Sequence, residues 1–169
     1  ICRVGDDFYM VTSSFSYFPG VPVFQSRDLV SWEQIGHCLD RPEQLPLDWQ
    51  YISGGVYAPT IRWHDGLFYM VTTNVSHGGN FFVTAVDPAG PWSDPVYIKG
   101  APGIDPTIFW DDDGTVWMTA TTDWQEQRPG VWIARLDLDT GCIQGERTLV
   151  WQGALVNAWS PEAPHIYKK

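Results

Sequence analysis

Apolar and polar residues alternate over short runs throughout the chain, as expected for β-strands that bury one face. The clearest run, FYMVT at residues 8–12, recurs letter for letter at residues 68–72, and a looser copy, VWMTA, spans residues 116–120. A short apolar stretch and a tight turn precede each copy. The Asp65-Gly66 pair in the second turn is a strong hairpin signal, because glycine readily adopts positive φ. Each copy therefore predicts an antiparallel hairpin.

Each predicted hairpin is followed by two more strands, separated by a turn that contains Asp in every copy. The predicted first strands span residues 1–4, 60–64 and 107–111, the third strands residues 21–26, 81–86 and 131–138, and the fourth strands residues 33–35, 96–99 and 147–151. Four-stranded antiparallel units that repeat along a chain are typical of β-propeller blades. A β-sandwich also has many short strands, but it does not require the same turn chemistry in each unit. We therefore favour an all-β propeller.

The repeats predict a single propeller domain over residues 1–169, because no linker interrupts them. Its units are residues 1–57, 58–104 and 105–160, and residues 161–169 supply the first strand of a fourth blade. Three blades and one strand cannot close a ring, and closure is how propellers protect their strand edges. We therefore expect the chain to be part of a longer protein, whose remaining blades are its partner.

The composition narrows the classes of function. The hydrophobic content of 44% supports a packed core, and no apolar run reaches the roughly 18 residues that a membrane span requires. The net charge of -10 disfavours binding to nucleic acid, because phosphates attract basic surfaces. Cys2, Cys38 and Cys142 have no paired spacing, so neither a disulfide framework nor a zinc site is indicated. This composition suits a neutral substrate such as a sugar, indicates no cofactor and leaves the cellular compartment open.

The repeat also indicates where chemistry would lie. The first strands of propeller blades surround the central axis, so residues just before them converge on the mouth of the channel. That position is Ala58 in the second unit and Asp105 in the third, and Glu162 lies one residue further back in the fourth. Asp105 alone is also typical of an Asp-Pro turn, and Glu162 alone of a solvated loop. Their shared register favours a pair of carboxyl groups suited to glycoside hydrolysis.

Several phrases together resemble those of glycoside hydrolase family 43. They are ICRVGDDFY at residues 1–9, SFSYFPGVP at 14–22, SRDLVSW at 26–32, GGVYAPT at 54–60, GIDP at 103–106 and PEAPH at 161–165. The resemblance covers nearly the whole chain. It implies a five-bladed propeller that hydrolyses β-xylosides or α-L-arabinofuranosides in hemicellulose oligosaccharides with inversion.

The resemblance also implies roles for the two acids. Glu162 matches the general acid of the family, and Asp105 matches the Asp that tunes the pKa of that acid and orients it. The general base of the family is an Asp in an Asp-Pro-Ser phrase directly before the residue that matches Ile1, and it lies outside this chain. We therefore expect the chain alone to be inactive. Ala163 stands where the family usually has Gly.

Four further residues are expected at the substrate. By resemblance, Phe15 is an aromatic residue against the sugar, although a hydrophobic plug between blades is an alternative. Tyr57 precedes the axial position and offers an aromatic face for sugar C–H groups. Asn74 resembles a polar rim residue, and His165 follows Glu162 by three positions and helps to position it. No metal site is predicted, because the acidic turn at residues 111–114 lacks the spaced ligands of a calcium loop.

Two alternative functions are open at this point. A non-catalytic propeller that binds sugar or protein would explain the missing base, but it has no need of acids at both Asp105 and Glu162. A related five-bladed enzyme acting on fructosides is disfavoured only by the resemblance of FPGVP at residues 18–22.

Overall fold

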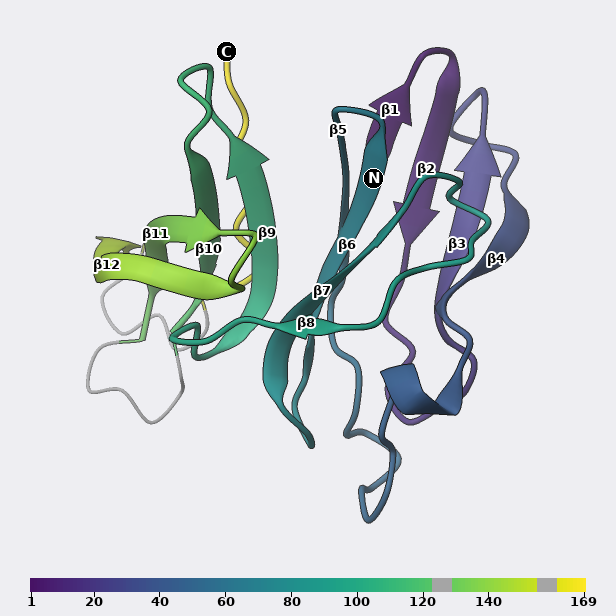
Figure 1. Cartoon of the computed structure of the whole chain (residues 1–169), viewed down its shortest axis with the longest axis horizontal. Coiled ribbons are helices and arrows are strands. Elements are labelled where there is room, and N and C mark those ends of the chain that lie inside the picture. Colours follow the sequence, from purple (N-terminus) through teal and green to yellow (C-terminus); the bar gives the residue numbers. More distant parts are fainter. Residues whose placement is uncertain (123–128, 155–160) are drawn as a thin grey trace.

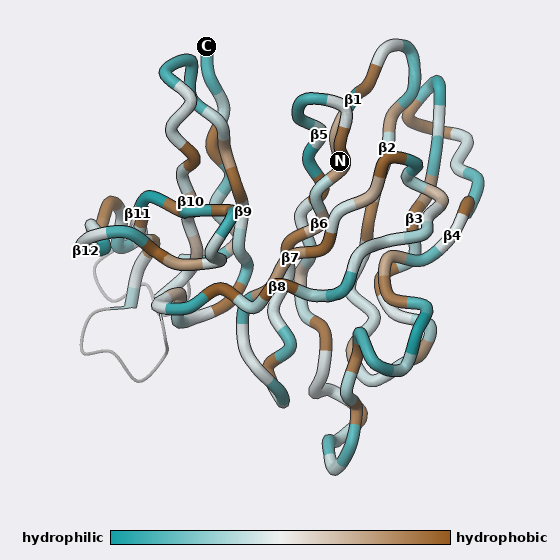
Figure 2. Tube along the Cα trace, in the orientation of Figure 1, coloured by the Kyte–Doolittle hydropathy of each residue, from teal (hydrophilic) through white to brown (hydrophobic). Residues whose placement is uncertain are grey.

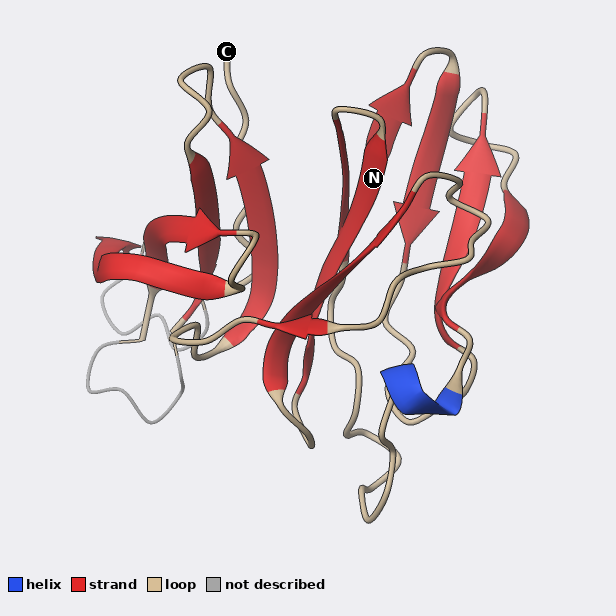
Figure 3. Ribbon diagram, viewed as in Figure 1, coloured by secondary structure: helices blue, strands red, loops and turns tan. Residues whose placement is uncertain are grey.

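The computed structural model describes residues 1–122, 129–154 and 161–169. These residues form three four-stranded antiparallel sheets and one short 3-10 helix (Figures 1 and 3). The strands are β1 (Cys2–Val4), β2 (Asp7–Val11), β3 (Gly20–Ser26), β4 (Glu33–Leu39), β5 (Thr60–His64), β6 (Leu67–Asn74), β7 (Gly79–Ala85), β8 (Val96–Tyr97), β9 (Ile104–Trp110), β10 (Val116–Thr121), β11 (Val131–Asp137) and β12 (Cys142–Trp151); the helix is η1 (Pro42–Gln44).

Each sheet is one blade, because its strands pair in chain order: β1 to β4, β5 to β8 and β9 to β12. The predicted hairpins are confirmed. His64 pairs with Leu67 across a two-residue turn, in which Asp65 has φ 46° and Gly66 has φ 84°. Two successive residues at positive φ form the type I′ turn that matches the twist of the flanking strands. The all-β propeller prediction is therefore confirmed at the level of blades.

Several strand boundaries differ from the predicted ones: β4, for example, runs to Leu39 instead of residue 35. Two other differences concern β9 and β12. β9 begins at Ile104, so Asp105 lies inside the strand instead of before it. β12 begins at Cys142, because Gln144 pairs with Arg135 and the chain then bulges before pairing resumes. Gly145 lies in this bulge at φ 75°. A bulge interrupts the alternation of apolar and polar residues, so the pattern revealed only the second half of the strand.

Residues 161–169 carry no strand assignment. They run beside β9, where Figure 1 shows them in yellow: the amide of Ala163 lies 3.2 Å from Oδ2 of Asp105, and Nζ of Lys168 lies 3.1 Å from Oδ1 of Asp111. A strand needs a hydrogen-bonded neighbour, and none is present in the described part of the chain. Residues 161–169, predicted to be the first strand of a fourth blade, thus lie beside β9 and make no strand-to-strand hydrogen bonds in the described part of the chain.

The middle blade buries both of its faces. Successive residues of a strand point to opposite sides, and in β6 Phe68 and Met70 join the core shared with the first blade, whereas Val71 joins the core shared with the third. Tyr9 of the first blade packs edge-on against Phe68, with ring centroids 5.0 Å apart. Figure 2 shows brown, hydrophobic stretches in the strands of all three sheets. The copy of FYMVT at residues 68–72 is therefore apolar at nearly every position because both of its faces are covered.

We expect Met70→Ala to lower the free energy of unfolding of the complete polypeptide by about 3 kcal/mol, because Met70 is fully buried and truncation leaves a cavity. Urea denaturation measures this change. Val30→Ala is the control: Val30 is 82% exposed in a turn, and its loss should change stability by less than about 0.5 kcal/mol. Equal effects of the two substitutions would contradict burial of Met70 in the core that the middle blade shares with the first.

Candidate active site

Asp105 lies in a bulge of β9. Ile104 pairs with Thr121 and Thr107 pairs with Thr119, so two residues of β9 face a single residue of β10. The backbone of Asp105 has φ 56°, in a region that L-residues adopt at a cost of about 1–2 kcal/mol. Bulges of this kind redirect a side chain and are frequent beside active sites. Here the bulge turns Asp105 out of the regular alternation of the strand.

The loop before Asp105 is held by Asn80 of the middle blade. The buried Asn80 side chain donates to the carbonyls of Ala101 (2.8 Å) and Gly103 (3.2 Å), and it accepts from the Thr73 hydroxyl (2.6 Å). Gly103 has φ 87°, and a Cβ there would lie 1.7 Å from the carbonyl oxygen of Thr121. Glycine is therefore required at position 103. The hydrogen bonds from Asn80 hold residues 101–103 in place directly before Asp105.

Asp105 and Glu162 are brought together across the boundary between the third blade and residues 161–169. Oδ2 of Asp105 accepts a hydrogen bond from the backbone amide of Ala163, at 3.2 Å. Burial raises the pKa of Asp105, the charge of Glu162 raises it further, and the Ala163 amide opposes both effects. Ala163 itself has φ 54°, a conformation that favours glycine. Glu162 is exposed and directly precedes Ala163. The Asp105 carboxylate therefore holds the turn that carries Glu162, through the backbone amide of Ala163.

Phe15 and Tyr57 form an aromatic pair at the junction of the first two blades. Their ring centroids are 5.9 Å apart, with 66° between the ring planes. The backbone of Phe15 exchanges two hydrogen bonds with Val56, at 2.9 and 3.0 Å. Phe15 is 42% exposed, which is more than a plug between blades would be. The pair thus presents aromatic surface next to Ala58, the residue that the sequence predicts to face the central axis from the second blade.

Asn74 occupies a different position from the one predicted. Its side chain is only 1% exposed. Its Oδ1 accepts from the amides of Ser76 and His77, both at 3.1 Å, and its Nδ2 donates to the carbonyl of Pro46, at 3.1 Å. An Asn that binds the backbone two residues on forms an Asx turn. Asn74 therefore holds two loops together and offers no exposed atom to a sugar.

His165 points to Arg62 of the middle blade. Nη2 of Arg62 lies 3.4 Å from Nδ1 of His165. Burial lowers the pKa of His165, and the positive charge of Arg62 lowers it further. No sequence signal pointed to Arg62, because it lies in a regular strand of another blade. A motif search along the chain therefore could not find this contact.

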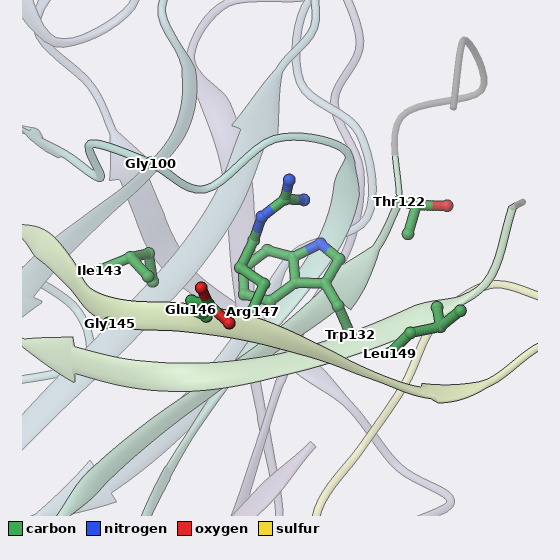
Figure 4. Close-up of a pocket in the computed structure, with 8 residues that line it drawn as sticks. All are labelled: Gly100, Thr122, Trp132, Ile143, Gly145, Glu146, Arg147 and Leu149. Atoms are coloured by element: carbon green, nitrogen blue, oxygen red, sulfur yellow. The ribbon is translucent and has the colours of Figure 1, made fainter. Parts of the chain in front are cut away.

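A separate pocket of about 520 Å³ lies on the third blade (Figure 4). Trp132 and Leu149 line it, and the guanidinium of Arg147 lies 5.6 Å from the centroid of the Trp132 ring. Neither Asp105 nor Glu162 lines this pocket.

The described ranges contain no group of three or more His, Cys, Asp or Glu side chains arranged to hold a metal ion. They also contain no helix of the length and hydropathy needed to cross a membrane.

The described blades bring the Asp105 carboxylate to the loop that carries Glu162, and a pair of neighbouring carboxyl groups is typical of glycoside hydrolases. The chain belongs to glycosyl hydrolases family 43, whose model matches residues 1–169. It is 52% identical to a xylosidase/arabinosidase of Butyrivibrio fibrisolvens, over all of this chain and 34% of that protein. It is 45% identical to a non-reducing end α-L-arabinofuranosidase of Bacteroides ovatus, over 99% of this chain and 31% of that protein.

Solved structures agree with this assignment. The Bacteroides ovatus "Xyloglucan PUL GH43B" structure superposes with a TM-score of 0.88 at 46% identity, over 99% of this chain and 32% of that one. A xylan β-1,4-xylosidase of Bacillus halodurans superposes with a TM-score of 0.86 at 35% identity, over 99% of this chain and 34% of that one. The chain therefore spans about a third of the length of the curated relatives that it matches.

We expect Asp105→Asn to stabilise the complete polypeptide above the pH range in which Asp105 ionises. Because folding raises the pKa of Asp105 above the ordinary value of 3.8, the folded state binds the proton more tightly, and stability falls as pH rises through the interval between the two values. An uncharged Asn removes this loss and still accepts from Ala163. Thermal unfolding measured across pH should show that the variant is more stable than the unsubstituted protein, by a difference that grows as Asp105 ionises and then becomes constant.

Asp113→Asn is the matched control. Hydrogen bonds from Thr115 lower the pKa of Asp113, so its ionised form is favoured in the folded state and the substitution should not stabilise. A gain for Asp113→Asn equal to that for Asp105→Asn would show that the effect is one of overall charge.

Ala163→Gly should raise the free energy of unfolding by about 0.5–1 kcal/mol, since relief of the positive φ outweighs the greater freedom of glycine in the unfolded chain. Ala89→Gly, in a turn where φ is not positive, should instead lower it. Urea titrations of the two variants give the comparison, and a loss for Ala163→Gly would refute the strained turn.

Proposed function

We propose that the complete protein is an exo-acting, inverting glycosidase that releases xylose or arabinofuranose residues from hemicellulose oligosaccharides. Membership of family 43 and relatives named for xylosidase and arabinosidase activities support the reaction class. The observation that carries the proposal is the bond from the Ala163 amide to Asp105, which ties the loop of Glu162 to a second carboxylate.

In this mechanism Glu162 is the general acid that protonates the departing glycosidic oxygen. Such an acid must hold its proton until the substrate arrives, and two neighbouring carboxyl groups do not easily ionise together. The raised pKa of Asp105, caused by burial and by the charge of Glu162, is consistent with this coupling. Asp105 therefore acts as the residue that orients the acid loop and tunes its electrostatics.

An inverting glycosidase also needs a general base, about 6.5–9.5 Å from the acid, so that a water molecule fits between them. We propose that this base is an Asp outside residues 1–169. The chain spans only about a third of the length of its relatives, which leaves room for such a residue, and Asp105 is already bonded to the Ala163 amide. Residues 1–169 by themselves then supply the acid and its partner but cannot activate water.

Phe15 and Tyr57 are proposed to contact the sugar. Aromatic faces attract the C–H groups of sugars. Phe15 packs edge-to-face against Tyr57 and is still partly exposed, so it can contact a sugar ring.

The role of Glu162 predicts a dependence on the leaving group. In the complete polypeptide, Glu162→Gln should lower kcat on xylobiose or an arabino-oligosaccharide by about 100-fold or more, because the sugar alkoxide leaves only when protonated. The loss on nitrophenyl β-D-xyloside should be smaller, because nitrophenolate needs little protonation. Steady-state assays on both substrates test this.

Glu146→Gln, on the outer strand of the third blade, serves as the control and should leave both rates unchanged. Equal losses on both kinds of substrate for Glu162→Gln would exclude Glu162 as the acid.

Residues 1–169 expressed alone should show no turnover of nitrophenyl β-xyloside or nitrophenyl α-L-arabinofuranoside. Appreciable turnover that Glu162→Gln abolishes would overturn the proposal that the base lies elsewhere.

A further inference from the structure

Arg62 of β5 reaches from the middle blade to two other segments of the chain. Its Nε lies 3.3 Å from the carbonyl oxygen of Ile108, and its Nη2 lies 3.2 Å from the hydroxyl of Thr107. The same Nη2 lies 3.4 Å from Nδ1 of His165, and the guanidinium carbon lies 5.1 Å from the ring centroid of Tyr167. One side chain therefore contacts both β9 and residues 161–169.

These two segments carry the two acids. Thr107 follows Asp105 by two positions in β9, and His165 follows Glu162 by three positions. Because residues 161–169 have no ladder hydrogen bonds in the described part of the chain, side-chain contacts decide where they lie. Lys168 binds the far end through Asp111, and Arg62 binds the middle.

The contact with His165 constrains the state of that ring. An arginine side chain only donates hydrogen bonds, so Nδ1 of His165 must accept, and the proton of the neutral ring must sit on Nε2. Protonation of Nδ1 would replace the acceptor with a donor and place two cations together. The charged and titratable groups that face His165 are Arg62, the amino group of Ile1 in this chain, and the phenol of Tyr167, which stacks on the ring with centroids 6.1 Å apart.

We infer that Arg62 is a positioning residue for the proposed glycosidase: through Thr107 and neutral His165 it sets the loop of Glu162 against Asp105. This inference rests on the proposed function, since it assigns the consequence of the contact to acid catalysis. Arg62 does not touch the sugar in this scheme, so it should affect the step in which the leaving group is protonated and not the binding of substrate.

The test uses the complete polypeptide with Arg62→Met, Arg62→Lys and a pair of His165 variants. Arg62→Met should lower kcat on xylobiose by about 10- to 100-fold with KM nearly unchanged, and should affect nitrophenyl β-xyloside much less. The kcat of Arg62→Lys should lie between those of Arg62→Met and the unsubstituted protein, because one ammonium group cannot make all the contacts of the planar guanidinium. A loss that is equal on both substrates, or that appears only in KM, would overturn the inference.

His165→Asn and His165→Leu form a matched pair. The Asn Oδ1 replaces Nδ1 as the acceptor for Arg62 and does not titrate, so this variant should keep kcat within about threefold and retain activity at lower pH than the unsubstituted protein. His165→Leu should lose activity as Arg62→Met does, and the double variant should lose little more, because both changes break one contact. Full additivity would contradict a shared role.

Nuclear magnetic resonance of the His165 ring keeps the contact testable if Arg62→Met folds poorly or if the protein has no turnover. The unsubstituted ring should be the Nε2–H tautomer near neutral pH, and Arg62→Lys should shift that equilibrium. An Nδ1–H ring in the unsubstituted protein would refute the contact itself. Absence of turnover with the Nε2–H tautomer present would instead refute the proposed function, and with it the catalytic role of Arg62.

Discussion

The structure depends on burial of both faces of the middle blade. A sheet that is covered on one side needs apolar residues only at alternate positions, whereas β6 supplies Phe68 and Met70 to one core and Val71 to the other. This packing sets the three sheets side by side around a common axis. The first strands of the second and third blades depend on this packing, because β5 supplies Ile61 to one core and β9 supplies Ile108 to the other.

The candidate site is assembled by contacts that cross between blades. Asn80 of the second blade holds the loop that leads to Asp105 in the third, and the Asp105 carboxylate holds the Ala163 amide in the segment that follows. Each contact joins a residue of a strand, Asn80 in β7 or Asp105 in β9, to a segment that is not in a strand. These contacts begin at Asn80 in β7 and end at Ala163, the residue that follows the exposed Glu162. Contacts of this kind would hold the proposed acid in place although its side chain is exposed.

Much of this arrangement was predictable from the sequence. Repeated phrases and Asp-Gly turns set the blades and their register, and that register brought Asp105 and Glu162 to one place. Arg62 and Asn80 were not predictable as parts of the site, because each acts through neighbours that are close only in the folded protein. Asn74 shows the opposite error: its resemblance to a family residue suggested a polar rim, but its side chain is buried and forms an Asx turn. Local patterns predict strands and turns better than they predict which way a polar side chain points.

Backbone strain is concentrated where the site is built. Phe15, Asp105 and Ala163 all have positive φ, at 49°, 56° and 54°, although none of them is glycine. Such conformations persist only where the surrounding structure determines them, and they are frequent at functional sites. Phe15 is held by its two hydrogen bonds to Val56, and Asp105 and Ala163 are held by each other. The positive φ of Ala163 is therefore supported by the carboxylate to which the proposed role of electrostatic tuning is assigned, so that the backbone geometry of this loop and the pKa of Asp105 depend on the same hydrogen bond.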